Sequence, residues 1–188
     1  MRLLDAPHAQ DFITHLETFE GRTNYLDLGT GGLPTVGVGC AVPYSGVSES
    51  LEWQGGMGAV GIAAAEWNVI KNATPGLSAK AYAHLTTLRL PDAEIDRLRD
   101  ARIDTMETDL INAISGVSAF PMPVRQALCD MAFNLGSGRL HSEYFSQHSK
   151  FGLAIYAGDW QTAAQESARR GIAQARNDYV RDLIMAGL

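Results

Sequence analysis

Residues 20–39 read Glu-Gly-Arg-Thr-Asn-Tyr-Leu-Asp-Leu-Gly-Thr-Gly-Gly-Leu-Pro-Thr-Val-Gly-Val-Gly, and this stretch decides the fold that we expect. Apolar side chains before it recur at helical spacing, so we predict a helix over residues 9–20. Gly21 follows the last helical residue directly, at the position where a glycine commonly ends a helix. The stretch therefore begins with one carboxyl group, that of Glu20, held at a helix end.

The rest of the stretch has the pattern of a β-hairpin. Two strand-like runs, Tyr25–Leu28 and Thr35–Val38, flank the glycine-rich residues 29–32, which favour a tight turn with positive φ angles. The first strand carries Asp27 and the second begins with Thr35. Strand residues alternate between two faces, so these two side chains converge only if the turn pairs them across the hairpin.

These groups suit the cleavage of a glycosidic bond. One carboxyl group must be protonated to donate to the leaving oxygen, while another group holds a water molecule or the developing positive charge. Burial at the helix end would keep Glu20 protonated near neutral pH, and Asp27 on a wetter hairpin would stay ionised. The alternative is that Glu20 is a solvated charge in the last helical turn, as most carboxylates are.

The helix–Glu-Gly, Tyr-x-Asp and Thr-Val-Gly-Val-Gly motifs resemble the start of the phage T4-type lysozymes, glycoside hydrolase family 24. The resemblance implies that Glu20 is the general acid and that Asp27 and Thr35 position the attacking water. Glu20 and Thr35 have the separation that is usual in the family. Asp27 stands two positions before the family's aspartate, whose place Gly29 takes here, and the turn after it is longer.

Two later blocks extend this resemblance. An apolar helix ends Phe-Asn-Leu-Gly at residues 133–136, and in the family the residue at the position of Asn134 faces the sugar cleft. An arginine near the C-terminus pairs with the catalytic glutamate in these lysozymes; Arg176 is the best match and Arg170 its competitor. Without the resemblance, Asn134 is a candidate helix C-cap and the arginines are a candidate solvated cluster.

The fold that we expect is α+β and mostly α, a lysozyme-like fold in a single domain over residues 1–188. A small β-hairpin lobe over about 21–56 and a larger helical lobe, including helix 9–20, would flank a cleft. Further helices are predicted over residues 59–72, about 91–115 as a link between the lobes, 123–136, from Ser142 as a cap, from Trp160 behind an Asp159 cap, and over about 177–185.

The composition of the chain limits the kinds of partner and cofactor that we expect it to bind. The chain has 188 residues, is 46% hydrophobic and has a net charge of −6, which disfavours nucleic acid because a phosphate-binding surface needs a basic excess. Apolar stretches are too short for membrane insertion or a signal peptide, so we expect export by a holin or a secretion system. Cys40, Cys129 and the histidines, including His141 and His148, lack metal-ligand spacing, so no metal or cofactor is expected. Cys129 is predicted to be a buried thiol.

Three functions are compatible with these patterns. The leading interpretation is a muramidase that hydrolyses the β-1,4 bond between N-acetylmuramic acid and N-acetylglucosamine, for bacterial cell lysis. The displaced Asp27 leaves open a lytic transglycosylase that uses Glu20 alone, and a non-catalytic wall-binding module is the third reading. We expect a monomer that acts on peptidoglycan glycan strands in the periplasm or cell wall. A phage endolysin, a tail lysin and an interbacterial effector with an immunity protein all fit this description.

Overall fold

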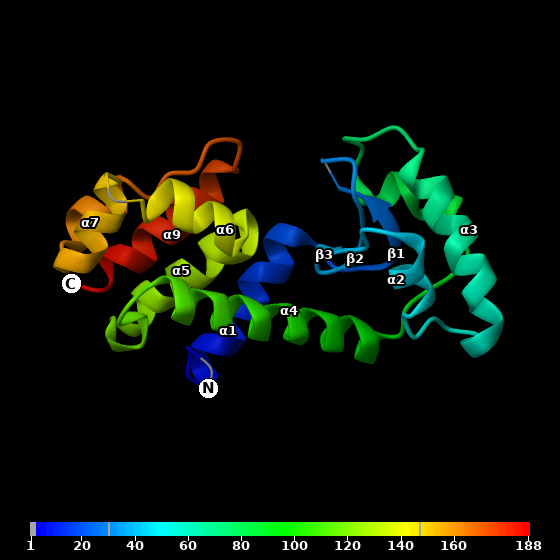
Figure 1. Cartoon of the computed structure of the whole chain (residues 1–188), viewed down its shortest axis with the longest axis horizontal. Helices are drawn as coiled ribbons and strands as arrows, with labels where there is room; N and C mark the ends of the chain where they lie inside the picture. The colour runs from blue at the N-terminus through cyan, green and yellow to red at the C-terminus, as the bar shows by residue number, and fades with distance from the viewer. Residues whose placement is uncertain (1–2, 30, 147) are drawn as a thin grey trace. The chain divides into compact units, whose positions relative to one another are not determined.

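The computed structural model describes residues 3–29, 31–146 and 148–188 (Figure 1). Helices dominate, and a single three-stranded antiparallel sheet accompanies them in the described residues, which confirms the α+β, mostly α class. The chain divides into two compact units, one of Glu20–Arg102 and one of Met1–Phe19 with Ile103–Leu188. We call them the sheet unit and the helical unit. The single domain with a hairpin lobe over about 21–56 stays a prediction.

The sheet unit begins with the hairpin that the sequence predicts and adds short helices to it. Its elements are β1 (Thr23–Leu28), β2 (Pro34–Gly37), β3 (Cys40–Ala41), α2 (Ser45–Glu49), the 3-10 helix η1 (Gly56–Ala59), α3 (Val60–Lys71), the 3-10 helix η2 (Ala79–Leu85) and the first half of α4 (Asp92–Ala113). The strand order is β1-β2-β3. Cys40 begins β3, because Val38 and Gly39 turn the chain between β2 and β3.

The register of the hairpin decides which side chains meet. Asp27 on β1 lies opposite Thr35 on β2, so the condition for their convergence is met. Across the turn, the Gly32 N–H donates to the Gly29 carbonyl at 2.8 Å, and the Gly29 N–H donates to the Leu33 carbonyl at 3.0 Å. Thr30, which belongs to the predicted turn, lies outside the described residues. The glycine-rich turn therefore closes the hairpin in the register that pairs the two polar residues.

Helix α3 covers the sheet and supplies its polar anchors. The Trp67 indole N–H donates to the Val42 carbonyl at 2.7 Å, which ties the helix to the end of β3. On the same helix, the carboxylate of Glu66 is buried and accepts from the Thr87 hydroxyl at 2.7 Å and from the Leu88 N–H. A buried carboxylate needs such donors to offset its lost hydration. These bonds hold the segment before α4 against α3.

The helical unit packs around α5 (Figure 1). Its elements are α1 (Ala6–Glu20, up to Phe19), the second half of α4, the 3-10 helix η3 (Val117–Ala119), α5 (Met122–Leu135), α6 (Ser137–Arg139), the π-helix η4 (Leu140–Tyr144), α7 (Lys150–Ala157), α8 (Trp160–Gln165) and α9 (Gln174–Met185). Both α5 and α8 pack against α9. Helix α4 contributes residues to both units, and its role as a link between a hairpin lobe and a helical lobe stays a prediction.

Two of the predicted helix-end residues are confirmed and two are wrong. Asp159 caps α8 by accepting from the Thr162 N–H at 3.0 Å, and Gly21 follows α1 with a φ of +77°, both as predicted. Ser142 is no helix cap, because it lies inside η4. Asn134 is not a C-cap either: Gly136 ends α5, and its N–H donates to the Ala132 carbonyl.

Candidate active site

Glu20 lies where the sequence places it, at the last position of α1. The glycine after it turns the backbone away and leaves the carboxyl group partly exposed. One carboxylate oxygen, Oε2, lies 3.2 Å from the point that a Cβ on Gly39 would occupy. The helix end is therefore close to the β2–β3 turn of the sheet unit, to which Glu20 belongs.

Asp27 and Thr35 form a hydrogen-bonded pair on adjacent strands. The Thr35 hydroxyl donates to Asp27 Oδ1, and the Thr23 hydroxyl also bonds to the Asp27 carboxylate. Burial raises the pKa of Asp27 above its ordinary value, and the bonds from Thr35 and Thr23 oppose that rise. The sequence predicted that solvent around the hairpin would keep Asp27 ionised. That reason is wrong, because the surroundings of Asp27 raise its pKa through burial. Only the two hydroxyl groups favour ionisation, while the surroundings of the carboxylate oppose it.

These three residues line one pocket of about 310 Å³ in the sheet unit. Glycines form much of its remaining wall, among them Gly37 and Gly39. Backbone without side chains leaves room for a ligand to approach closely, which is a common role of glycine in a binding site. The pocket thus contains a carboxyl group on a helix end and, from the sheet, a second carboxyl group with a hydroxyl group bonded to it.

Asn134 lies in the last turn of α5, in the helical unit. Its Oδ1 atom is buried and has no hydrogen-bond partner among the described residues. A buried amide oxygen without a donor is uncommon, and it is free to accept from a ligand hydroxyl or N–H group. Asn134 and the pocket of Glu20 belong to different units, so its role in binding substrate stays a prediction.

Arg176 is not part of a solvated cluster. Arg176 and Arg169 are buried and share the carboxylate of Asp130, at 2.9 Å from Arg169 Nη1 and 3.0 Å from Arg176 Nε. The guanidinium of Arg176 also lies over the ring of Phe19, 5.4 Å from its centre. Arg170, the competing candidate, is exposed. The pairing of Arg176 with Glu20 joins residues of different units and stays a prediction.

Sequence reasoning missed Asp130, Arg169 and Asn177, which complete this buried network. Asn177 Oδ1 accepts from the Arg169 backbone N–H, and its side-chain amide donates to the Arg169 carbonyl at 3.0 Å. The signal was present: Asp130 interrupts a run of apolar residues on α5, and a carboxylate on a buried helix face needs a cation. Periodicity alone did not show which arginine would supply it.

The described residues contain no group of three or more histidine, cysteine or acidic side chains that could hold a metal ion. Within the same ranges, no helix is both long and apolar enough to span a membrane.

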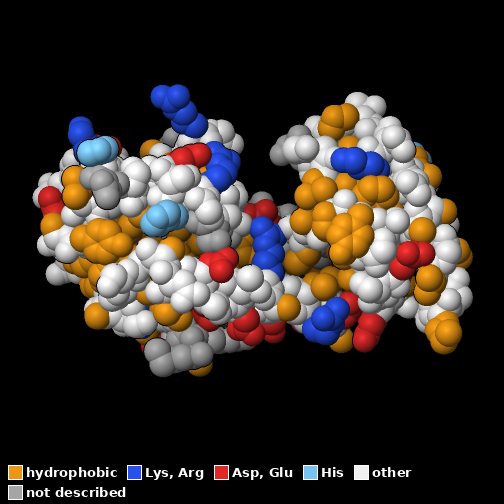
Figure 2. All heavy atoms as spheres, viewed as in Figure 1, with side chains coloured by type: hydrophobic (Ala, Val, Ile, Leu, Met, Phe, Trp, Pro, Cys, Tyr) orange, Lys and Arg blue, Asp and Glu red, His pale blue; other side chains and the backbone are white. Residues whose placement is uncertain are grey.

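Cys40 and Cys129 are free thiols, and both are buried, as predicted for Cys129. On the face of the helical unit that Figure 2 shows, Lys and Arg side chains are scattered among uncharged ones.

No protein-family model matches the chain, and no curated protein matches it. Several solved structures share its fold, and two of them serve as examples. One is the muramidase domain of SpmX from Asticaccaulis excentricus, which is 13% identical, with 94% of this chain and 95% of that chain covered and a TM-score of 0.56. The other is the active form of P1 phage endolysin Lyz, which is 16% identical, with coverages of 98% and 86% and a TM-score of 0.56. The chain therefore has a phage-lysozyme-like fold.

Proposed function

We propose that this protein is a muramidase that hydrolyses the β-1,4 bond between N-acetylmuramic acid and N-acetylglucosamine in peptidoglycan, for bacterial cell lysis. One observation carries the proposal. Glu20, Asp27 and Thr35 line a single pocket, in which the Thr35 hydroxyl donates to the Asp27 carboxylate. Hydrolysis of a glycoside needs a proton donor and an activated water molecule, and these three side chains supply both.

In this mechanism, Glu20 donates its proton to the glycosidic oxygen while a water molecule attacks the anomeric carbon. Asp27 accepts the proton of that water, and Thr35 orients the water with its hydroxyl oxygen. The burial that raises the pKa of Asp27 makes its carboxylate a stronger base than a solvated aspartate. The products are a sugar that ends in reducing N-acetylmuramic acid and a new N-acetylglucosamine end.

The helical unit would supply the remaining substrate contacts. We assign Asn134 to a sugar hydroxyl or acetamido group, because its buried Oδ1 lacks a partner among the described residues. Arg176 is assigned to pair with Glu20, and the Asp130 carboxylate would fix its guanidinium in place. The glycan strand is then the partner, in the periplasm or cell wall, with export through a holin or a secretion system.

Lytic transglycosylation is the second candidate, because Asp27 is displaced from the family position. In that reaction the muramic 6-hydroxyl takes the place of water, and Glu20 alone suffices. The hydrogen bond between Thr35 and Asp27 favours hydrolysis, because it directs both groups to the same part of the pocket. A wall-binding module without activity would have no need for this constellation.

Mass spectrometry of muropeptides released from purified peptidoglycan separates these functions. We expect reducing N-acetylmuramic ends, and a loss of release of about 10²-fold or more in the isosteric Glu20→Gln variant, which lacks the transferable proton. Ends in 1,6-anhydro-N-acetylmuramic acid would establish the transglycosylase. Binding to peptidoglycan without any release, or undiminished release by a folded Glu20→Gln protein, would remove the catalytic assignment.

A further inference from the structure

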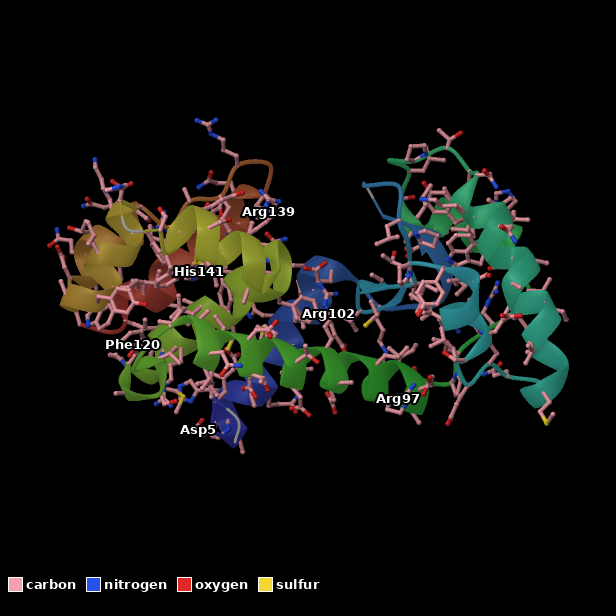
Figure 3. The ribbon with its side chains drawn as sticks, viewed as in Figure 1. Asp5, Arg97, Arg102, Phe120, Arg139 and His141 are labelled. Atoms are coloured by element: carbon pink, nitrogen blue, oxygen red, sulfur yellow. The ribbon has the colours of Figure 1, made fainter. Side chains whose placement is uncertain are left out.

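Arg102 connects α4 to the turn between β2 and β3. Its Nη1 donates to the Val38 carbonyl at 3.3 Å and to the Gly39 carbonyl. Figure 3 shows its side chain extending from α4 next to this turn, whereas Arg97 projects from the same helix nearer its start. Two successive carbonyl groups bound to one guanidinium fix the turn more firmly than a single neutral bond, because a charged donor strengthens each bond.

Gly39 lies close to both this guanidinium and the carboxyl group of Glu20. A Cβ at this position would lie 3.2 Å from Glu20 Oε2 and 3.3 Å from Arg102 Nη1, so both groups lie against its α-carbon. The φ angle of Gly39 is +62°, which disfavours any other residue. Glycine is therefore favoured here for two reasons, the backbone conformation and the carboxyl and guanidinium groups that lie next to its α-carbon.

We propose that Arg102 is a positioning residue for Glu20, and this rests on the function proposed above. By binding the Val38 and Gly39 carbonyls, Arg102 holds the turn against which the Glu20 carboxyl group lies. Its fixed positive charge also lies beside the group that becomes a carboxylate when it gives up its proton. A preorganised charge at the place where charge develops stabilises that step without reorganisation.

Other charged and titratable groups surround Glu20. Asp27 on β1 lines the same pocket, and Glu17 precedes Glu20 by one turn of α1. Burial raises the pKa of the Cys40 thiol, and the charge of Arg102 opposes that rise. The contribution of Arg102 must therefore be isolated by its own substitution.

The test compares Arg102→Gln and Arg102→Lys with Arg97→Gln, which removes a charge nearer the start of α4. For Arg102→Gln we expect kcat to fall about 10-fold or more with KM little changed, as loss of a charge felt mainly in the transition state implies. Arg102→Lys keeps the charge and should recover most of kcat. Arg97→Gln leaves kcat in place.

Crystal structures of the protein without substrate separate this proposal from the muramidase. A displaced Glu20 carboxyl group and a shifted Val38–Gly39 turn in Arg102→Gln support the positioning role even if the reaction is not the one proposed. An unmoved carboxyl group with an unchanged kcat in Arg102→Gln, or an equal loss of kcat in Arg97→Gln, would overturn the role of Arg102. Release of reducing ends by the wild-type protein would still support the hydrolase.

Gly39→Ala and Gly76→Ala provide a second, independent comparison. Both glycines have positive φ angles, +62° and +81°, but a Cβ at Gly76 would meet nothing within 4 Å. Similar backbone strain should lower the two melting temperatures by similar amounts. Only Gly39→Ala should lose activity, by about 10-fold or more, because it displaces Glu20 and Arg102. Equal activities in the two variants at a temperature where both are folded would contradict the positioning role.

Discussion

Asp130→Asn tests the buried network of the helical unit most directly. The carboxylate of Asp130 is 1% exposed at its side chain and lies between two buried guanidinium groups, with 2.9 Å to Arg169 Nη1 and 2.9 Å to Arg176 Nη2. Burial lowers the pKa of Arg169, and the charge and hydrogen bond of Asp130 oppose that effect. The substitution keeps the shape of the side chain but leaves two cations facing a neutral amide.

The expected loss follows from this geometry. Removal of one partner from a buried ion pair typically costs about 3–5 kcal/mol, because the remaining charge stays desolvated without compensation. For a chain of 150–250 residues, each kcal/mol corresponds to roughly 2–4 °C in melting temperature. We therefore expect a decrease of about 6–20 °C. The exposed pair of Asp178 and Arg181 is the control, and Asp178→Asn should cost less than about 1 kcal/mol.

Urea unfolding monitored by circular dichroism, together with thermal scans, gives both values on the same samples. The far-ultraviolet spectrum of Asp130→Asn at low temperature confirms that the helices form before the comparison is made. A loss equal to that of Asp178→Asn would refute the reasoning, because it would mean that water or relaxation compensates the two arginines fully. An Asp130→Asn protein that is more stable than wild type would refute it as well.

The remaining predictions concern the groups proposed to act on the substrate. Asp27→Asn should reduce hydrolysis about 10²-fold or more while its melting temperature at pH 7 equals or exceeds that of wild type. Burial raises the pKa of Asp27 in the folded state, so its contribution to stability is present below the unfolded pKa and is lost as pH rises; a lower melting temperature would contradict this sign. Thr35→Val removes a bond that lowers the pKa of Asp27, so the acidic limb of the pH–activity profile should move to higher pH. An unmoved limb would show that Thr35 does not influence the pKa of Asp27. Arg176→Ala should lower activity less than Glu20→Gln and shift the pH profile; an unchanged rate and profile in the folded variant would leave Arg176 a purely structural partner of Asp130.

The sequence predicted the parts of the fold that local chemistry decides. The hairpin follows from glycines between two strand-like runs, and the end of α1 follows from Gly21. In contrast, β3 has only two residues, too few for alternation to be visible, so the sequence did not predict it. A strand this short depends on its partner for stability rather than on its own propensity.

In the candidate site, too, local sequence rules anticipate the contacts between residues near in sequence and miss the distant ones. Glu20, Asp27 and Thr35 are near one another in sequence, and the hairpin register brings two of them together, which local rules anticipate. The role of Arg102 depends on contacts with Val38 and Gly39, more than sixty positions away in the chain. No periodicity encodes such a contact, because it is set by how α4 packs beside the sheet.

The two cysteines have a practical consequence for following how the molecule opens. Cys40 belongs to the sheet unit and Cys129 to the helical unit, and both thiols are free and buried. Burial raises the pKa of each thiol, which suppresses the reactive thiolate while the surrounding structure is intact. Each unit thus contains its own natural reporter group, and the rates at which a thiol reagent modifies the two positions measure the opening of the two units separately, without any engineered label.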